Sequence, residues 1–132
     1  MGDICRCISE KISIKRVYDS ASPEDGRRIL VDGLWPRGLS KEAAQVDAWM
    51  REVAPSAQLR RWFGHRPDRF EEFRQRYVRE LCEDNVRKEK VDELLKLSRT
   101  GRLTLLFAAK DTKHNHVVVL RDVLATSLKS AL

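Results

Sequence analysis

The chain of 132 residues lacks the features that mark membrane, secreted or disulfide-linked proteins. No segment approaches the ~20 consecutive apolar residues that a helix needs to cross a bilayer. Charged residues, Asp3 and Arg6 among them, interrupt the apolar residues near the N-terminus, unlike the core of a secretion signal. Only three cysteines occur, and an odd number disfavours a disulfide framework. These absences predict a cytoplasmic protein with no membrane partner.

The motifs of the common catalytic and cofactor-binding sites are also missing. The chain has no Gly-x-Ser-x-Gly elbow, no Walker phosphate loop, no Gly-x-Gly-x-x-Gly turn and no His-Glu-x-x-His pair. Cys5 and Cys7 are separated by one residue, and no second pair stands at zinc-finger spacing. His114 and His116 lack a nearby third ligand. We therefore expect no cofactor and no metal, and we expect Cys82 to be a small buried side chain.

Positive charge is present in excess and is unevenly distributed. The 26 basic and 20 acidic residues give a net charge of +6, and seven arginines fall within residues 60–79. This arginine-rich segment suits a nucleic-acid-binding module in which an exposed Trp62 stacks on bases. The alternative is a solvated helix face, on which Arg76 forms i,i+4 ion pairs with Glu72 and Glu80.

The composition indicates one globular domain. Hydrophobic residues make up 42% of the chain, and there is no internal repeat, low-complexity tract or long linker. A chain of this length can bury a core without disulfides or a structural metal. We expect residues 1–11 to form a mobile extension and residues 12–132 to form a single α/β domain.

Three segments have the patterns of strands. Residues 12–17 alternate apolar and polar side chains, and residues 28–32 form a short β-rich run after the turn signals of residues 20–26. Residues 103–107 are almost continuously apolar, which is typical of a strand buried on both faces of a parallel sheet.

Helical spacing accounts for most of the rest. Residues 40–53 favour a helix, with an extended run over 48–53 as the alternative. Ser56 should cap a short helix that ends at Gly64. The spacing then predicts a helix from Pro67 to Glu83 that buries four side chains: Phe70, Phe73, Tyr77 and Leu81.

Two more helices follow from the same periodicity. The first covers residues 85–98 and turns Val86, Leu94 and Leu97 inward. The second begins near Val117 and runs to Leu128, with a hairpin strand as its alternative because of the β-branched residues 117–119. The sum is an α/β domain with a small, largely parallel sheet flanked by helices.

Two polar loops follow strands and are the natural place for a ligand. Residues 33–38 follow Asp32, and residues 108–116 follow Phe107. Ligands of open α/β sheets lie outside the carboxyl ends of the strands, where helix N-termini offer unpaired N–H groups. If the two strands are parallel neighbours, these loops face each other across one cleft.

Several side chains in these loops suit a small anionic ligand. Arg37 is a candidate anion clamp, and Lys110 would add a point charge. Trp35, beside Pro36, offers a flat apolar wall for a ring or a base. The structural alternatives stay open: Arg37 can tie Asp32 or a helix C-terminus, and Trp35 can fill the core.

The second loop carries groups that could move protons. His114 and His116 are the candidate catalytic residues, with Asp111 or Asp32 fixing a tautomer. Thr112 or Asn115 would cap the following helix or bond the ligand. The alternative is that both histidines are surface or capping residues.

Four separate motifs give the chain a family resemblance. They are Val-Asp-Gly-Leu-Trp-Pro-Arg-Gly at 31–38, Val-Ala-Pro-Ser at 53–56, Phe-Arg-Gln-Arg-Tyr-Val-Arg-Glu-Leu at 73–81 and Leu-Leu-Phe-Ala-Ala-Lys-Asp-Thr-Lys-His-Asn-His-Val-Val-Val-Leu at 105–120. Over residues 12–128 the chain resembles the YeaO-like family of bacterial proteins, a domain of unknown function. The resemblance implies a Rossmann-like α/β fold and a bacterial cytoplasmic setting, but no established activity.

The chain departs from the pattern of the family that it resembles at two places. The family commonly has arginine where this chain has Gly33, so anion binding here would depend more on Arg37 and Lys110. A broader branch carries a Cys-His-Arg element in the loop corresponding to residues 112–116, and this chain has no cysteine there. A thiol mechanism is therefore disfavoured, and any chemistry would use imidazole, amine or carboxylate groups.

The favoured hypothesis is a cleft that binds a small anionic or phosphate-bearing ligand, with catalysis left open. The rivals are the nucleic-acid-binding module of residues 60–79 and a non-catalytic oligomeric adaptor. The sequence does not define the oligomeric state.

Overall fold

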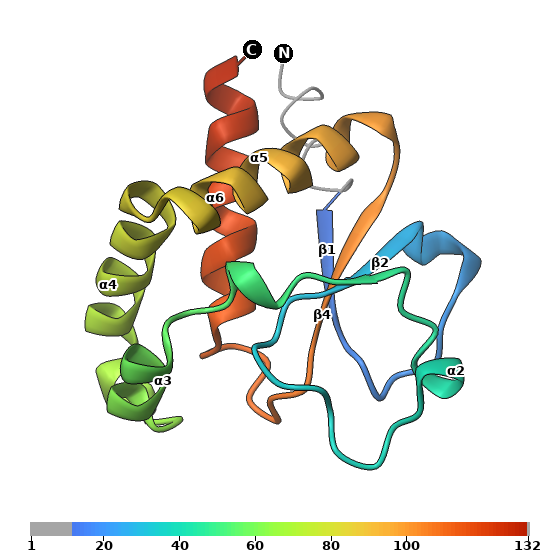
Figure 1. Ribbon diagram of the computed structural model, residues 1–132, viewed down its shortest axis with the longest axis horizontal. Coiled ribbons are helices and arrows are strands. Elements are labelled where there is room, and N and C mark those ends of the chain that lie inside the picture. Colours follow the sequence, from blue (N-terminus) through green and yellow to red (C-terminus); the bar gives the residue numbers. More distant parts are fainter. Residues whose placement is uncertain (1–11, 132) are drawn as a thin grey trace.

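The computed structural model describes residues 12–131, with side chains described as far as residue 127. It is a single α/β domain with a four-stranded, all-parallel sheet (Figure 1), which confirms the predicted fold class. The sheet order is β1-β4-β2-β3, with β1 at Ile12–Arg16, β2 at Arg27–Leu30, β3 at Ala48–Trp49 and β4 at Leu103–Phe107. The predicted mobile extension at residues 1–11, including Cys5 and Cys7, lies outside the described residues.

Five α-helices accompany the sheet in this part of the chain. They are α2 at Lys41–Ala44, α3 at Ala57–Phe63, α4 at Phe70–Glu83, α5 at Asn85–Thr100 and α6 at His116–Ala131. Three short 3₁₀ helices occupy connections: Pro23–Asp25, Arg51–Val53 and Pro67–Arg69. No described helix combines the length and apolar character needed to cross a membrane.

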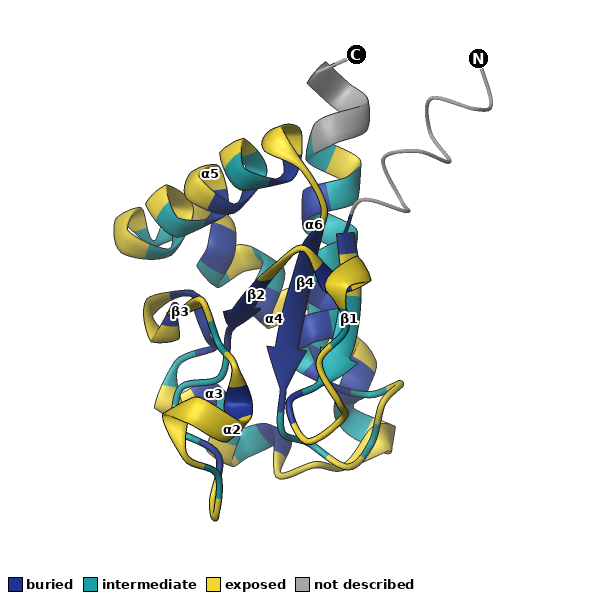
Figure 2. Ribbon diagram, turned by 90° about the vertical axis from the view of Figure 1, so that its right-hand side faces the viewer, coloured by how far each residue is buried: buried dark blue, intermediate teal, exposed yellow. Residues whose placement is uncertain are grey.

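Every residue of the central strand β4 is buried (Figure 2). Leu105 and Phe107 join the large core under α3, α4, α5 and α6, whereas Leu106 joins a smaller cluster with Val17 and Leu30. Since successive side chains of a strand point to opposite faces, the apolar run of β4 fills both layers. Its predicted burial on two faces is confirmed.

The predicted ends of the short helix α3 are confirmed, and an unforeseen contact supports its beginning. The Ser56 hydroxyl oxygen accepts from the Leu59 N–H at 3.2 Å, and Gly64 ends the helix in the left-handed conformation. The Glu80 carboxylate accepts from the Ser56 N–H at 2.9 Å and from its hydroxyl at 2.6 Å. Arg76 pairs with Glu72 as predicted, whereas Glu80 holds the start of α3.

The continuous helix predicted over residues 40–53 is wrong. The helix α2 ends after Ala44 because Gln45 takes a left-handed conformation with φ of 49°. The Asp47 carboxylate then accepts from the N–H of Arg28 at 2.8 Å, and the next residues pair with β2 as the edge strand β3. Sheet pairing therefore overrides the helical spacing, as the extended alternative anticipated in part.

Two side chains predicted to be buried are exposed. Val86 lies in the first turn of α5 and is 51% exposed, because the buried stripe of that helix runs through Val91 and Leu94. Cys82 of α4 is also exposed, since it is turned away from the stripe that contains Leu81. The predicted inward positions of these two residues are wrong.

The final helix α6 is confirmed, and the hairpin alternative is wrong. Val117, Leu120 and Leu124 are fully buried against the sheet and its neighbouring helices. The helix begins directly after the loop that leaves β4 and runs back along the sheet (Figure 1). Its N-terminus therefore lies at the carboxyl ends of the strands.

Candidate functional site

The two polar loops meet at one end of the sheet, as predicted. β2 and β4 are parallel neighbours, and the Asp32 carboxylate after β2 accepts from the N–H of Ala108 after β4 at 2.8 Å. In Figure 2 the arrowheads of β1 and β4 point toward this end, where exposed loops gather. A cleft of about 730 Å³ lies between the loops, within the usual range of roughly 300–1,000 Å³ for small-molecule sites.

Asp32 and His116 form a nearly buried pair on one wall of this cleft. The Nε2 atom of His116 lies 3.0 Å from the carbonyl oxygen of Val31 and 3.3 Å from Asp32 Oδ1. Because a carbonyl oxygen can only accept, His116 must carry its hydrogen on Nε2 to make the first contact. The pair therefore joins the start of α6 to the end of β2.

The surroundings shift the pKa of both members of this pair. Burial raises the pKa of Asp32 above 3.8, although the charge of His116 and the N–H of Ala108 oppose the shift. Burial lowers the pKa of His116 below 6.5, against the opposing effects of Asp32 and the Val31 carbonyl. Each shift disfavours the charged form, because little water reaches the groups. Such shifts mark functional sites and buried structural pairs alike, so the bonding partners decide between these roles.

The second loop uses its polar side chains to hold its own backbone. The Asp111 carboxylate accepts from the N–H groups of Lys113 and His114 at 2.9 and 3.0 Å, bonds that lower the pKa of Asp111. Asn115 donates to the Asp111 carbonyl at 2.8 Å and accepts from the N–H of Val117 at 2.9 Å, which caps α6. Of the two cap candidates, Asn115 makes these bonds.

Two predicted site residues of this loop, His114 and Thr112, do not line the cleft. The ring of His114 packs edge-on against Phe70 at 5.3 Å, and its Nδ1 lies 3.0 Å from Asp111 Oδ2. Thr112 is exposed. Four other predicted site residues do line the cleft, and their hydrogen bonds hold the two loops in place. We call these residues the bonded group: Asp32, Asp111, Asn115 and His116.

The cationic residues of the cleft are arranged differently. Arg37 and Lys110 line the cleft and are exposed. Arg60 of α3 lines it as well and is half-buried. Within residues 12–127, none of these three side chains donates a hydrogen bond or forms an ion pair. We call them the cationic group.

Trp35 is held by the loop that contains it and also faces the cleft. Its Nε1 donates to the carbonyl of Leu39 at 2.6 Å, and its ring meets Trp49 edge-on at 5.5 Å. It packs on the smaller core cluster and also lines the cleft. Trp49 in turn donates to the Asp32 carbonyl at 2.8 Å. Trp35 thus supplies an apolar wall that the surrounding loop keeps in place.

Sequence reasoning missed the contribution of the end of β1. Arg16 donates to the carbonyls of Ala108 and Ala109 at 3.2 and 3.1 Å. Tyr18, which lines the cleft, donates to the Arg37 carbonyl at 3.0 Å and lies under the Arg16 guanidinium. Only the parallel pairing of β1 with β4 brings these residues to the loops, so no local signal reveals them.

The arginine-rich segment is largely engaged with its own neighbours. The guanidinium groups of Arg69 and Arg76 lie over the Trp62 ring, with centres 5.3 and 4.4 Å from its centroid. Arg66 pairs with Asp68 at 3.1 Å, and Arg74 pairs with Asp122 at 3.0 Å.

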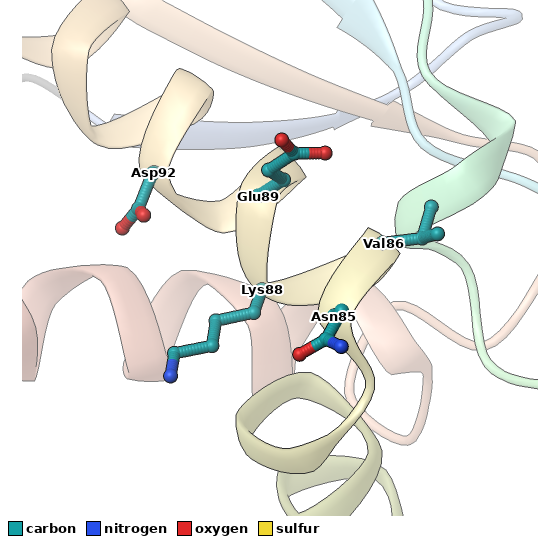
Figure 3. A pocket seen from close by; sticks show the side chains of 5 residues that line it. All are labelled: Asn85, Val86, Lys88, Glu89 and Asp92. Carbon is teal, nitrogen blue, oxygen red and sulfur yellow. The ribbon is translucent and has the colours of Figure 1, made fainter.

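A second hollow, of about 330 Å³, lies on the surface of α5 (Figure 3). All its lining residues belong to the segment 85–92, and the side chains of Val86 and Asp92 point in different directions. The hollow therefore offers no converging set of polar groups. The described residues also contain no cluster of three or more histidine, cysteine or acidic side chains that could hold a metal.

Comparison with known proteins identifies relatives over most of the chain. Residues 11–132 match a family model described as the inactive DUF488-N3 subclade. The uncharacterised protein YeaO of Escherichia coli is 42% identical over 111 residues, which cover 84% of this chain and 94% of YeaO. The uncharacterised protein Rv3073c of Mycobacterium tuberculosis is 38% identical over 114 residues, which cover 86% and 93% of the two chains. No solved structure gives a significant match.

Proposed function

Because the chain belongs to the DUF488-N3i family, described as an inactive subclade, we propose that it binds a small anionic ligand without transforming it. The ligand would place an oxyanion against the cationic group and a ring or apolar body against Trp35 and the neighbouring aromatic side chains. One observation carries this proposal: three cations line the cleft without forming an ion pair within the described residues, while the carboxylates of Asp32 and Asp111 each accept from backbone N–H groups.

The composition of the cleft supports binding over catalysis. Its lining contains no cysteine, serine or threonine, and the hydroxyl that it does contain, that of Tyr18, donates to the Arg37 carbonyl. His116 commits its Nε2–H to the Val31 carbonyl, and Asp111 commits its carboxylate to the loop. A general base needs a free position within reach of the substrate proton. The Asp111 carboxylate is held by the loop, and the Nε2–H bond of His116 leaves Nδ1 as its basic nitrogen.

The cationic group is better placed for an anion than the arginine-rich segment is for a nucleic acid. Arginines over Trp62 cover the ring that would stack on bases. If the segment nevertheless binds nucleic acid, the logarithm of the affinity must fall steeply with the logarithm of the salt concentration. A weak or salt-insensitive interaction with a generic single strand would support the cleft as the binding site.

Phenyl phosphate is a suitable probe because it joins a ring to an oxyanion. We expect it to raise the melting temperature more than inorganic phosphate or phenol does, since each of these supplies only half of the contacts. The double variant Arg37→Gln/Lys110→Gln should weaken binding at least about tenfold, the effect of losing about 1.4 kcal/mol.

Arg61→Gln/Lys96→Gln is a matched control, because it removes two positive charges from exposed positions outside the cleft. Equal losses in the two double variants would contradict the proposed site. Phosphate release from phenyl phosphate should stay at the rate of the protein-free solution. Turnover that disappears in His116→Gln would show instead that the cleft is catalytic.

A further inference from the structure

Arg60 occupies space that a side chain on the neighbouring loop would fill. A Cβ atom placed on Gly33 would lie 2.6 Å from Arg60 Nη1, 2.9 Å from Cζ and 3.2 Å from Nη2. Real Cβ contacts essentially never fall under 3.0 Å, so the guanidinium can lie here only because position 33 has no side chain. Gly33 does not have a left-handed φ, so the backbone conformation does not require glycine here. What glycine provides at this position is space for the Arg60 guanidinium.

The guanidinium of Arg60 makes no hydrogen bond or ion pair within the described residues. Its Nε is buried and has no hydrogen-bond partner, and no other atom of this side chain bonds within the described residues. A buried N–H without an acceptor costs about 1–3 kcal/mol, and native proteins keep few such groups. An arginine held in this way beside a cleft is more consistent with binding an external acceptor than with supporting the structure.

The position of Arg60 differs from that of the other two cations. Arg37 and Lys110 are exposed, where water competes for their charges, whereas Arg60 is half-buried. Its charge also reaches the pair behind it. Burial raises the pKa of Asp32 and lowers the pKa of His116, and the charge of Arg60 opposes the first shift and adds to the second. However, Asp32 Oδ2 accepts from the Ala108 N–H, and Oδ1 lies 3.3 Å from His116 Nε2 without a hydrogen-bond partner. No ion pair joins Asp32 to Arg60 within the described residues.

We propose that Arg60, seated on Gly33, is the residue that binds the oxyanion of the ligand in the cleft. This inference rests on the proposed anion-binding function and names its central contact. A planar guanidinium donates two parallel N–H groups to a carboxylate or a phosphate, which the point charge of a lysine cannot reproduce. Arg37 and Lys110 then attract the ligand and enclose it at the surface.

Calorimetric titration with phenyl phosphate and with benzoate tests this role and distinguishes the two sources of oxyanion. Arg60→Gln should weaken binding of the preferred probe by about 13-fold or more, because a charge-assisted contact is worth about 1.5–3 kcal/mol. Arg60→Lys should recover only part of this loss, because it restores the charge without the fork. Arg61→Gln is the matched control, since it removes an exposed arginine of the same helix outside the cleft and should bind within about twofold of wild type.

Gly33→Ala supplies an independent test, since it changes neither the charge nor Arg60 itself. The added methyl group should displace the guanidinium, which is the flexible end of its side chain, and weaken binding by about tenfold. Urea unfolding of this variant should give nearly wild-type stability, because displaced side-chain ends cost little and no left-handed backbone is involved. This variant also keeps the test decisive if Arg60→Gln folds poorly.

The outcomes separate the two proposals. If the wild-type protein binds neither probe, the proposed function fails and this inference fails with it. If the wild type binds and Arg37→Gln/Lys110→Gln weakens binding while Arg60→Gln and Gly33→Ala do not, the cleft binds anions without Arg60. Loss of affinity in both Arg60→Gln and Gly33→Ala, with Arg61→Gln unaffected, supports Arg60 as the central contact.

Discussion

The bonded group and the cationic group line the same cleft but differ in how their polar atoms are used. Asp32, Asp111 and Asn115 each hold backbone N–H or carbonyl groups of the two loops. Arg37 and Lys110 hold none within the described residues, although their side chains are longer and can reach further. The first group ties the loops to the sheet, and the second is the group that we propose binds the ligand.

This difference shows which residue types stabilise the loop backbone and which remain available for other contacts. Short carboxylate and amide side chains reach only their own backbone neighbourhood, so they bond turns and helix caps. Long cationic side chains lose more conformational entropy when they are fixed, so exposed ones gain little from pairing within the fold. Stability should therefore depend on the bonded group, and affinity on the cationic group.

Substitution of Asp32 should have the largest effect on stability. Asp32→Ala leaves the Ala108 N–H without its acceptor and removes the partner of His116, which should lower the free energy of unfolding by about 2 kcal/mol. Urea unfolding followed by circular dichroism measures the change. Asp92→Ala, at an exposed position on α5, should stay within about 0.5 kcal/mol of wild type. If the two variants were equally stable, the claim that stability depends on the bonded group would be contradicted.

Removal of the α6 cap should have the next largest effect. Asn115→Ala should lower the free energy of unfolding by about 1 kcal/mol, because the N–H groups of Val117 and Val118 lose their acceptor. Asn115→Asp should recover most of the loss, since a carboxylate can accept the same bonds and favours a helix N-terminus. The same unfolding measurement applies, and an Ala variant as stable as wild type would remove Asn115 from the bonded group.

The pH dependence of the free energy of unfolding tests whether His116 is buried in the folded protein. Because burial lowers its pKa below 6.5, the unfolded chain takes up a proton more readily, and stability present above pH 6.5 is lost as the pH falls. The raised pKa of Asp32 acts in the opposite direction, since its contribution is present below pH 3.8 and is lost as the pH rises. His116→Gln should therefore show a smaller loss between about pH 7.5 and pH 5.5 than wild type. If the free energy of unfolding of the two proteins changed equally across this pH range, the lowered pKa of His116 would be contradicted.

The smallest effect on stability is expected in the cationic group. Arg37→Gln and Lys110→Gln should each change the free energy of unfolding by less than about 0.5 kcal/mol, because exposed side chains without partners contribute little to the fold. Binding of phenyl phosphate should fall in the same variants. A variant that loses stability in step with affinity would show that the cations support the loops after all.

Much of the fold was predictable because the signals were local. The apolar run of β4, the cap at Ser56 and the stop at Gly64 depend on residues that are close in sequence. The errors came where distant segments compete. Pairing with β2 converted part of residues 40–53 to an edge strand, and the first turn of α5 left Val86 outside the core.

The candidate site was predictable to the same extent. The loops at the ends of two strands could be placed because ligands of parallel sheets lie there, and Trp35, Arg37 and Lys110 do line the cleft. Arg60 and Tyr18 could not, because α3 and the end of β1 approach the loops only in the folded chain. The spacing of neither residue carries a sign of that approach.

The amino-acid sequence by itself determined the elements, the loops and the stock of polar side chains, since propensity, capping and apolar spacing act over a few residues. The tertiary structure decided which of those polar side chains form hydrogen bonds or ion pairs within the fold. Parallel pairing places Asp32 against the loop after β4, and the packing of α3 carries Arg60 onto Gly33. Hydrogen bonding is short-ranged, so whether a group is committed or free depends on neighbours that only folding supplies.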